Sequence, residues 1–342
     1  MVSRDTSMRI RWYRTPLDRH TLARLNARSD AKGFVQALGH LGPMALSGFL
    51  ALYGVERWPW WGIALIVLLH GTLASFILNG VHELVHKSVF RTQVLNSLFV
   101  RIFAFFGWVN FEHFYASHMR HHQYTLHPPD DLEVVLPIRL MVKEFFQTGF
   151  LNVCDGYDAL KTTVRHARGR FEGEWENVLF PEDRPERGDP VILWARTLLA
   201  GHLLILAFSI YSGWWLLPVL TSLTPFYGSW LFFLCNNTQH IGLQDKVPDF
   251  RLCCRTFTVN PVVEFLYWHM NYHTEHHMYA AVPCYNLAAL HRAIAHELPP
   301  CPHGLRATWK EIAAIQKIQS TQPGYQHVAQ LPGTDPSPLC IA

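Results

Sequence analysis

The chain has 342 residues, of which 49% are hydrophobic and 16% charged, and its formal net charge is only +3. This length allows one large domain or two small ones. No Lys/Arg-rich tract is interleaved with aromatic residues, so a nucleic-acid partner is not expected. The seven cysteines include no CxxC pair, which argues against a disulfide framework.

The N-terminal stretch, residues 1–33, carries many arginines and no long apolar run, unlike a cleavable signal peptide. By the positive-inside rule it predicts a basic cytosolic segment ahead of a first membrane span. We expect a membrane domain over residues 34–310. Residues 311–342 are expected to form a C-terminal tail whose end is disordered.

Four apolar runs are long enough to cross a bilayer, which takes roughly 20 mainly apolar residues. They cover about residues 34–54, 61–81, 191–211 and 214–235. Short turns join the members of each pair, and Tyr and Trp residues flank both turns like an interfacial aromatic belt. The pattern therefore favours two transmembrane hairpins over the buried helices of a soluble bundle.

Three histidine clusters stand at the ends of apolar runs, in the sequences HELVH, HMRHH and HTEHH. On a helix, positions i, i+3 and i+4 share one face, so each cluster directs two or three imidazoles at one point. Eight imidazoles exceed the four ligands that one zinc ion takes. They suit two metal ions that each keep a position open, and spacing alone leaves the metal undecided among iron, copper, zinc and nickel. The eight residues are His82, His86, His118, His121, His122, His273, His276 and His277.

A further apolar stretch over residues 92–111 is interrupted by Arg101. A fifth crossing there would put the clusters on opposite sides of the membrane, so we expect an interfacial or re-entrant helix. Two hairpins then place the clusters and both termini on the cytosolic side.

The forms HELVHK, HMRHH and HTEHH resemble, in order and spacing, the three histidine boxes of the membrane fatty acid desaturase and hydroxylase superfamily. The resemblance covers about residues 36–310. It implies an all-α integral membrane protein with four transmembrane helices in two hairpins and a cytosolic helical cap that holds a non-haem di-iron site. It assigns the eight box histidines as iron ligands and adds His240 of the NNTQH sequence. It also places Asn236 where an asparagine approaches one iron through water.

The same resemblance implies an O2-dependent enzyme that introduces a double bond into a lipid acyl chain or an amphiphilic metabolite. The HxxHH spacing and the sequence HHMYAAVPCYNL favour this desaturase branch, with hydroxylation as the alternative. No His-Pro-Gly-Gly haem motif occurs, so a separate ferredoxin or cytochrome b5 with its reductase would supply electrons. The host membrane would be the endoplasmic reticulum in a eukaryote and the inner or plasma membrane in a bacterium.

Two departures from the superfamily pattern affect the expected substrate. Phe114 and Tyr115 stand where many acyl desaturases have Trp-Arg, and Ala280 follows Tyr279 where proline is usual. We therefore do not expect a simple acyl-CoA specificity.

Ligating imidazoles need hydrogen-bond partners for their outer ring nitrogens. The candidates for this role are Glu83, His113, Asp130, Asp131, His269 and Glu275. His40, His70 and His202 lie within expected spans, where a polar side chain usually faces the bundle interior, so they are assigned structural hydrogen bonds.

Two other classes of protein remain as alternatives. HELVH also fits the H-E-x-x-H motif of an intramembrane zinc protease, which would leave the second and third clusters without a purpose. A non-catalytic haem or metal carrier would need single histidines on facing spans rather than clusters at the membrane edge.

Overall fold

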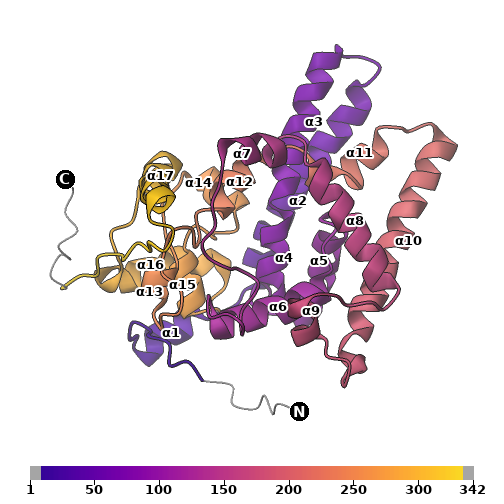
Figure 1. The fold of residues 1–342 in the computed structure, drawn as a ribbon. Helices are drawn as coiled ribbons and strands as arrows, with labels where there is room; N and C mark the ends of the chain where they lie inside the picture. Colours follow the sequence, from indigo (N-terminus) through magenta and orange to yellow (C-terminus); the bar gives the residue numbers. More distant parts are fainter. Residues whose placement is uncertain (1–8, 334–342) are drawn as a thin grey trace.

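The computed structural model describes residues 9–333, and these residues form helices and isolated bridges without a named strand. The elements gather into an apolar arm of long helices and a compact helical cap at one end of it (Figure 1). This arrangement agrees with the all-α architecture expected from the sequence.

The first apolar hairpin joins α2 (Asp30–Gly54) to α3 (Trp60–Ser75). Helix α2 begins where the Ser29 side chain accepts a hydrogen bond from the backbone N–H of Lys32, and it continues through Pro43. Helix α4 (Ile77–Val85) extends α3 after a break at Phe76. Together α3 and α4 form an apolar stretch of 26 residues that ends in the first histidine cluster.

The stretch expected to be interfacial or re-entrant forms two helices, α5 (Gln93–Phe106) and α6 (Phe111–Tyr124), which meet at an angle of 107°. Helix α5 packs against α4. The side chain of Asn110 caps the start of α6 by accepting a hydrogen bond from the backbone N–H of His113. The bend turns α6, with the second histidine cluster, across the end of the arm (Figure 1).

The third expected span is present as α10 (Asp189–Ser212), but the fourth is not one helix. Residues 214–235 are divided among α11 (Leu217–Thr221), the 3₁₀-helix η2 (Thr224–Phe226) and α12 (Trp230–Asn236). Pro218 and Pro225 each start a new short helix, because proline has no N–H to continue the previous one. The prediction of a continuous span there was wrong.

Between α6 and α10 the chain forms two helices that pack on the arm. They are α7 (Val142–Gly149), which contacts α12, and α8 (Val153–Ala167), which runs along α10. The short helices α9 (Glu174–Leu179) and η1 (Pro185–Arg187) follow.

The cap is built from the N-terminal helix and the chain beyond α12. Its elements are α1 (Arg19–Leu25), α13 (Phe250–Cys253), α14 (Pro261–Leu266), α15 (His273–Met278), η3 (Cys284–Asn286), α16 (Leu287–Ile294), η4 (Ala295–Glu297) and α17 (Gly304–Thr321). The expected tail thus begins inside a helix, and its last residues, 334–342, lie outside the described part of the chain.

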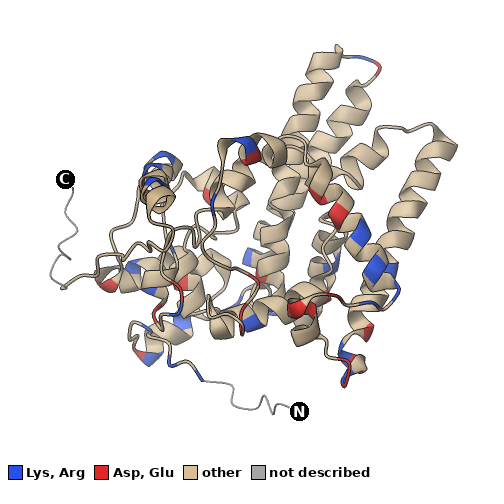
Figure 2. Ribbon diagram, in the orientation of Figure 1, with Lys and Arg blue, Asp and Glu red and all other residues tan. Residues whose placement is uncertain are grey.

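Charged residues are distributed unevenly over these two parts. Helices α2, α3 and α10 carry few charged residues over most of their length, whereas charged residues lie on the cap, on α7 and α8 and around α9 (Figure 2). Within residues 9–333, three helical segments are long and apolar enough to cross a membrane, or four if the bent pair α5–α6 counts as one span.

Candidate metal centre

The predicted histidine clusters lie on α4, α6 and α15, helices near the junction of the arm and the cap (Figure 1). His82 lies on α4 and His86 caps its C-terminus, while α6 carries the second cluster and α15 the third. His240 follows α12 in a short run of turns. Segments that are distant in the sequence therefore supply one site.

Five imidazoles form a first group, whose ligand nitrogens all lie within 4.8 Å of one another. Its members are His82, His86, His118, His122 and His276. Nε2 of His118 lies 3.2 Å from Nε2 of His86 and 3.0 Å from Nε2 of His122. Nε2 of His276 lies 3.1 Å from Nε2 of His122, so these four nitrogens converge.

Four further imidazoles form a second group, made of His121, His240, His273 and His277. Nε2 of His273 lies 2.9 Å from Nε2 of His240 and 3.1 Å from Nε2 of His277. We include His121 because its ring lies beside this group, with its centroid 5.0 Å from that of His277 and 5.4 Å from that of His240. The two groups adjoin, because the rings of His122 and His277 are stacked with centroids 4.3 Å apart.

The HxxHH clusters are shared between the groups in a regular way. In α6 the i and i+4 residues, His118 and His122, enter the first group, whereas His121 at i+3 enters the second. In α15 the i and i+4 residues, His273 and His277, belong to the second group, and the i+3 residue belongs to the first. Side chains at i and i+4 lie one above the other, and the i+3 side chain stands beside them.

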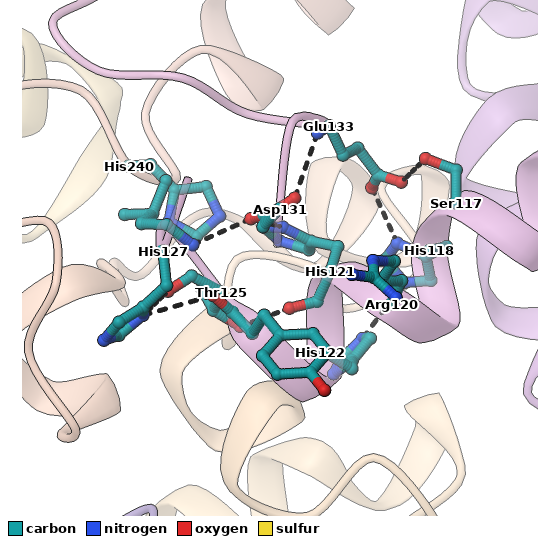
Figure 3. Close-up of polar contacts among 12 residues, drawn as sticks. Ser117, His118, Arg120, His121, His122, Thr125, His127, Asp131, Glu133 and His240 are labelled. Atoms are coloured by element: carbon teal, nitrogen blue, oxygen red, sulfur yellow. Dashed lines mark hydrogen bonds and ion pairs between the residues drawn. The ribbon is translucent and has the colours of Figure 1, made fainter. Parts of the chain in front are cut away.

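The outer ring nitrogens of several of these histidines are held by acceptors (Figure 3). Nδ1 of His118 donates to Oε1 of Glu133 at 2.9 Å, and Nδ1 of His121 donates to Oδ2 of Asp131 at 2.8 Å. Nδ1 of His240 donates to the backbone carbonyl of Cys253 at 2.7 Å. Each acceptor orients a ring and directs its Nε2 inward, as such partners do at metal sites.

The donor set fits two metal ions. Because a neutral imidazole has one N–H, an Nδ1 that donates outward leaves Nε2 with a bare lone pair. Such lone pairs converge at 2.9–3.2 Å in both groups. A metal–nitrogen bond is about 2.1 Å, so two ligands at a right angle stand roughly 3.0 Å apart. In addition, Nε2 of His82 and Nδ1 of His273 are buried without hydrogen-bond partners.

Burial also keeps these side chains in the form that binds metal. It lowers the pKa of His240 to about 3, and it holds the pKa values of His273 and His277 well below their usual range. Nearby imidazoles act in the same direction. These three rings are therefore neutral near pH 7, as metal ligation requires. The hydrogen bond to Asp131 outweighs burial at His121 and raises the pKa of that ring.

Two of the carboxylates expected to support the ligands contact box histidines. They are Asp131, described above, and Glu83, whose Oε1 accepts a hydrogen bond from Nδ1 of His82 at 3.0 Å. Sequence reasoning did not single out Glu133 or the carbonyl of Cys253. Glu133 stands two residues after Asp131, and that nearness was the available signal.

The other expected supports have different partners. Asp130 pairs with Arg120 at 2.8 Å, and Glu275 accepts hydrogen bonds from His291 and Thr256. Nδ1 of His269 donates to Glu264 at 3.0 Å. Asn236 ends α12, and its backbone carbonyl accepts a hydrogen bond from Gln239.

His113 belongs to a separate cluster with His166 and Glu176, at the junction of α6, α8 and α9. Oε1 of Glu176 accepts hydrogen bonds from Nε2 of His166 at 2.9 Å and from the guanidinium of Arg165 at 2.7 Å. Because Arg165 already balances this carboxylate, the cluster ties α8 to α9 rather than offering a free anionic ligand.

The histidines assigned structural roles in the arm make the expected hydrogen bonds. His40 accepts from Nε1 of Trp268 at 2.9 Å and bonds the carbonyl of Leu73. His70 bonds Ser47 and the carbonyl of Leu220, and His202 bonds Ser222 and the carbonyl of Phe105. This prediction is confirmed.

The second group also adjoins a thiol that sequence reasoning treated as uninformative. Sγ of Cys254 lies within 4.8 Å of the ligand nitrogens of His240, His273 and His277. Burial raises the pKa of this thiol well above its usual value, which keeps it protonated.

Comparison with known proteins agrees with this geometry. The family model for fatty acid desaturases matches residues 58–309, which include all nine histidines of the two groups. A search of curated proteins finds no match to the chain.

Proposed function

Because the chain belongs to the fatty acid desaturase family, we propose that it is an O2-dependent, di-iron membrane enzyme that introduces a double bond into a hydrocarbon chain. The family places the protein among membrane oxidoreductases of the desaturase and hydroxylase type. The proposed substrate is a lipid acyl chain or an amphiphilic metabolite.

The observation that carries this proposal is the division of nine imidazoles into two adjoining groups. We assign His82, His86, His118, His122 and His276 to one iron and His121, His240, His273 and His277 to the other. Iron ions held there would supply the redox chemistry that reduces O2 and removes hydrogen from an unactivated C–H bond. Asn236 is proposed to reach the second iron through water.

The protein's own groups have three tasks in this scheme. Asp131 and Glu133 hold the rings of His121 and His118 in position, and the carbonyl of Cys253 holds His240. Burial of the third box excludes water from the reacting centre. Electrons would come from a separate ferredoxin or cytochrome b5 with its reductase.

The geometry favours this reading over a zinc protease. In an H-E-x-x-H hydrolase the glutamate acts as a general base at an open metal position. Here Glu83 is fully buried, accepts the Nδ1–H of His82 and lies 3.4 Å from Nδ1 of His276. It therefore orients the ring of His82.

We further propose that the metal centre and both termini face the cytosol. The N-terminal segment contributes Arg9, Arg11, Arg14, Arg19 and Arg24 to the cap end. Such a bias marks the cytosolic side of a membrane protein.

The test is to purify the protein after iron-replete expression, measure its metals, and supply a reductase system with lipid extracts. We expect two irons per chain and a product lighter than its substrate by two hydrogen atoms. A product heavier by one oxygen atom would identify a hydroxylase instead. One zinc per chain, or haem absorbance, would contradict the di-iron assignment.

Single-ligand variants sharpen this test. His121→Ala and His276→Ala each remove one ring from a different group, so both are expected to lose product formation while remaining in the membrane fraction. His296→Ala is the matched control, because this exposed histidine lies outside both groups and should leave turnover unchanged. Turnover retained by either ligand variant would count against the assignment.

A further inference from the structure

The segment between the second histidine cluster and α10 exposes large apolar side chains in an unusual number. They are Met141, Val142, Phe146, Phe150, Leu151, Val153, Tyr157 and Leu160, on α7 and the first half of α8. Val142 is 76% exposed and Tyr157 is 67% exposed. Exposed apolar surface on this scale is typical of a site that another apolar phase covers.

Helix α8 is amphipathic rather than apolar all round. At 3.6 residues per turn, Val153, Tyr157 and Leu160 lie on one face, whereas Asp155 and Asp158 lie on the opposite face. Its far end carries exposed Lys161, Arg168 and Arg170. Basic residues at the end of an apolar helical face suit the phosphate level of a membrane.

Helix α8 packs along α10, which is long and apolar enough to cross a membrane. These contacts place α8 at the depth of the bilayer. At its end, the carbonyl of Ala167 accepts a hydrogen bond from Nε of Arg196, in the first third of α10. At its start, Val153 lines the same cavity as Trp108, whose ring stacks on His202 at 4.1 Å. His202 lies about 20 Å along α10 from Asp189, within a hydrocarbon core of about 30 Å.

The non-helical junction between α7 and α8 is satisfied by hydrogen bonds inside the protein. The backbone N–H of Asn152 donates to the carbonyl of Phe226 at 2.8 Å, and that of Gly228 donates to the carbonyl of Phe150 at 3.1 Å. Irregular backbone is tolerated at membrane depth only where protein or water satisfies it in this way.

Behind this segment lies an apolar cavity of about 630 Å³. Leu68 of α3, Gly156 of α8, Trp108 and Phe226 line it. Three of its other lining residues, Leu151, Val153 and Leu223, are exposed on the outer surface, so the cavity opens sideways from the arm.

A second cavity of about 340 Å³ shares Asn152 with the first. Its lining includes Leu78, one turn before His82 on α4, and Asn237, three residues before His240. It also includes Asp155, one of the two exposed aspartates on the polar face of α8. The two cavities therefore adjoin at Asn152, and the inner one is lined by residues close in sequence to two of the histidines.

We propose that residues 141–160 lie in the bilayer leaflet next to the metal centre as an amphipathic element, and that the cavity behind them admits a hydrocarbon chain from that leaflet. The apolar face of α8 and the exposed side chains of α7 contact lipid, and the face with Asp155 and Asp158 points away from it. Use of this cavity as the substrate path rests on the proposed function, whereas the membrane contact does not.

The orientation is tested with nitroxide labels at two adjacent positions, Tyr157→Cys and Asp158→Cys, in a Cys154→Ser, Cys301→Ser, Cys340→Ser background. The protein is reconstituted in phosphatidylcholine–phosphatidylglycerol vesicles. We expect the label at 157 to be relaxed mainly by O2, which partitions into lipid, and the label at 158 mainly by a water-soluble nickel chelate. Equal nickel accessibility at both positions, or O2 preference at both, would overturn the proposal.

The cavity is tested by photocrosslinking with a phospholipid that carries a diazirine on its acyl chain. We expect labelled peptides from residues 151–160 and 219–227. A Cβ at Gly156 would lie 3.3 Å from the Phe226 ring, so Gly156→Leu fills the cavity and should abolish this labelling. Gly42→Leu, which meets open space, should leave it unchanged.

Labelling that misses these peptides, or that persists in Gly156→Leu, overturns the cavity assignment. Neither readout requires bound metal or turnover. Failure of the desaturase proposal would leave both results in place, so the two proposals fail independently.

Discussion

The spacing of the histidines decides which group each ring can reach. HELVH has only an i, i+4 pair, and both rings enter the first group. HMRHH and HTEHH add a ring at i+3, and in each case this ring enters the group that the i, i+4 pair does not. A helix with the longer cluster therefore contacts both groups, which is why two such helices suffice to connect them.

The buried carboxylate of Asp131 connects the residues that hold one histidine ring in each group. Its Oδ2 accepts hydrogen bonds from Nδ1 of His121 at 2.8 Å and from the backbone N–H of Leu126 at 2.7 Å. Its Oδ1 accepts from the backbone N–H of Glu133 at 3.0 Å, and Glu133 in turn holds His118. The orientation of a ring in each group thus depends on this side chain (Figure 3).

Asp131→Asn is expected to weaken metal binding by about 10–100-fold, the usual loss when the partner of a ligating imidazole is changed. Asparagine keeps the size of the side chain but loses its charge and one acceptor oxygen. The measurement is iron retained per chain during dialysis against a graded chelator. Asp130→Asn is the matched control, since Asp130 pairs with Arg120 at the neighbouring position. Equal retention in the two variants would refute this role for Asp131.

At the scale of helices, the first histidine pair is positioned by close packing between α4 and α5. Gly80 lies two residues before His82, and a Cβ there would stand 2.4 Å from the ring of Phe103 on α5. The fully buried Trp268 lies against the same spot. Only a residue without a side chain lets the two helices approach this closely.

Gly80→Ala is expected to destabilise the protein by about 1–3 kcal/mol, as overpacking in a filled core usually does. Because α4 must shift away from Phe103, His82 is displaced and iron content should fall as well. The free energy change is followed by thermal unfolding in detergent, with iron per chain measured on the same sample. Gly42→Ala in α2 meets open space and should lower neither quantity.

The broken fourth span shows where a hydropathy pattern stops being informative. Residues 214–235 are apolar enough to cross a bilayer, yet two prolines and Gly228 divide them into short helices. Gly228 has φ of +72°, and a Cβ there would meet the backbone N of Thr72 at 2.8 Å. The break brings this segment against α3, where it forms one wall of the lateral cavity.

At the scale of the whole molecule, the metal centre is a set of imidazoles drawn from residues 82 to 277 and packed together in the interior. Without metal this arrangement makes stability depend on pH. Burial, reinforced by the charge of His121, lowers the pKa of His240 from 6.5 to about 3. Between these values the unfolded chain holds a proton on His240 that the folded chain does not, so acid favours unfolding.

The metal-free protein is therefore expected to lose thermal stability as the pH falls from about 7 to about 5, within the window in which histidine titrates. His240→Gln removes one contributing group and should lower this pH-dependent loss. The midpoints are measured by fluorescence in detergent after chelator treatment. An identical loss in both proteins would show that His240 titrates normally when the chain is folded.

The sequence alone determined the helical class, the apolar hairpin α2–α3, the metal-binding residue types and the family, because helical periodicity and ligand chemistry are local properties. Tertiary structure alone decided how the nine rings divide into two groups, that Glu133 and the Cys253 carbonyl hold two of them, and that residues 214–235 are broken. It also placed α8 beside α10 and left an apolar face of α8 exposed. These features depend on contacts between residues far apart in the chain, and no local pattern encodes such distances.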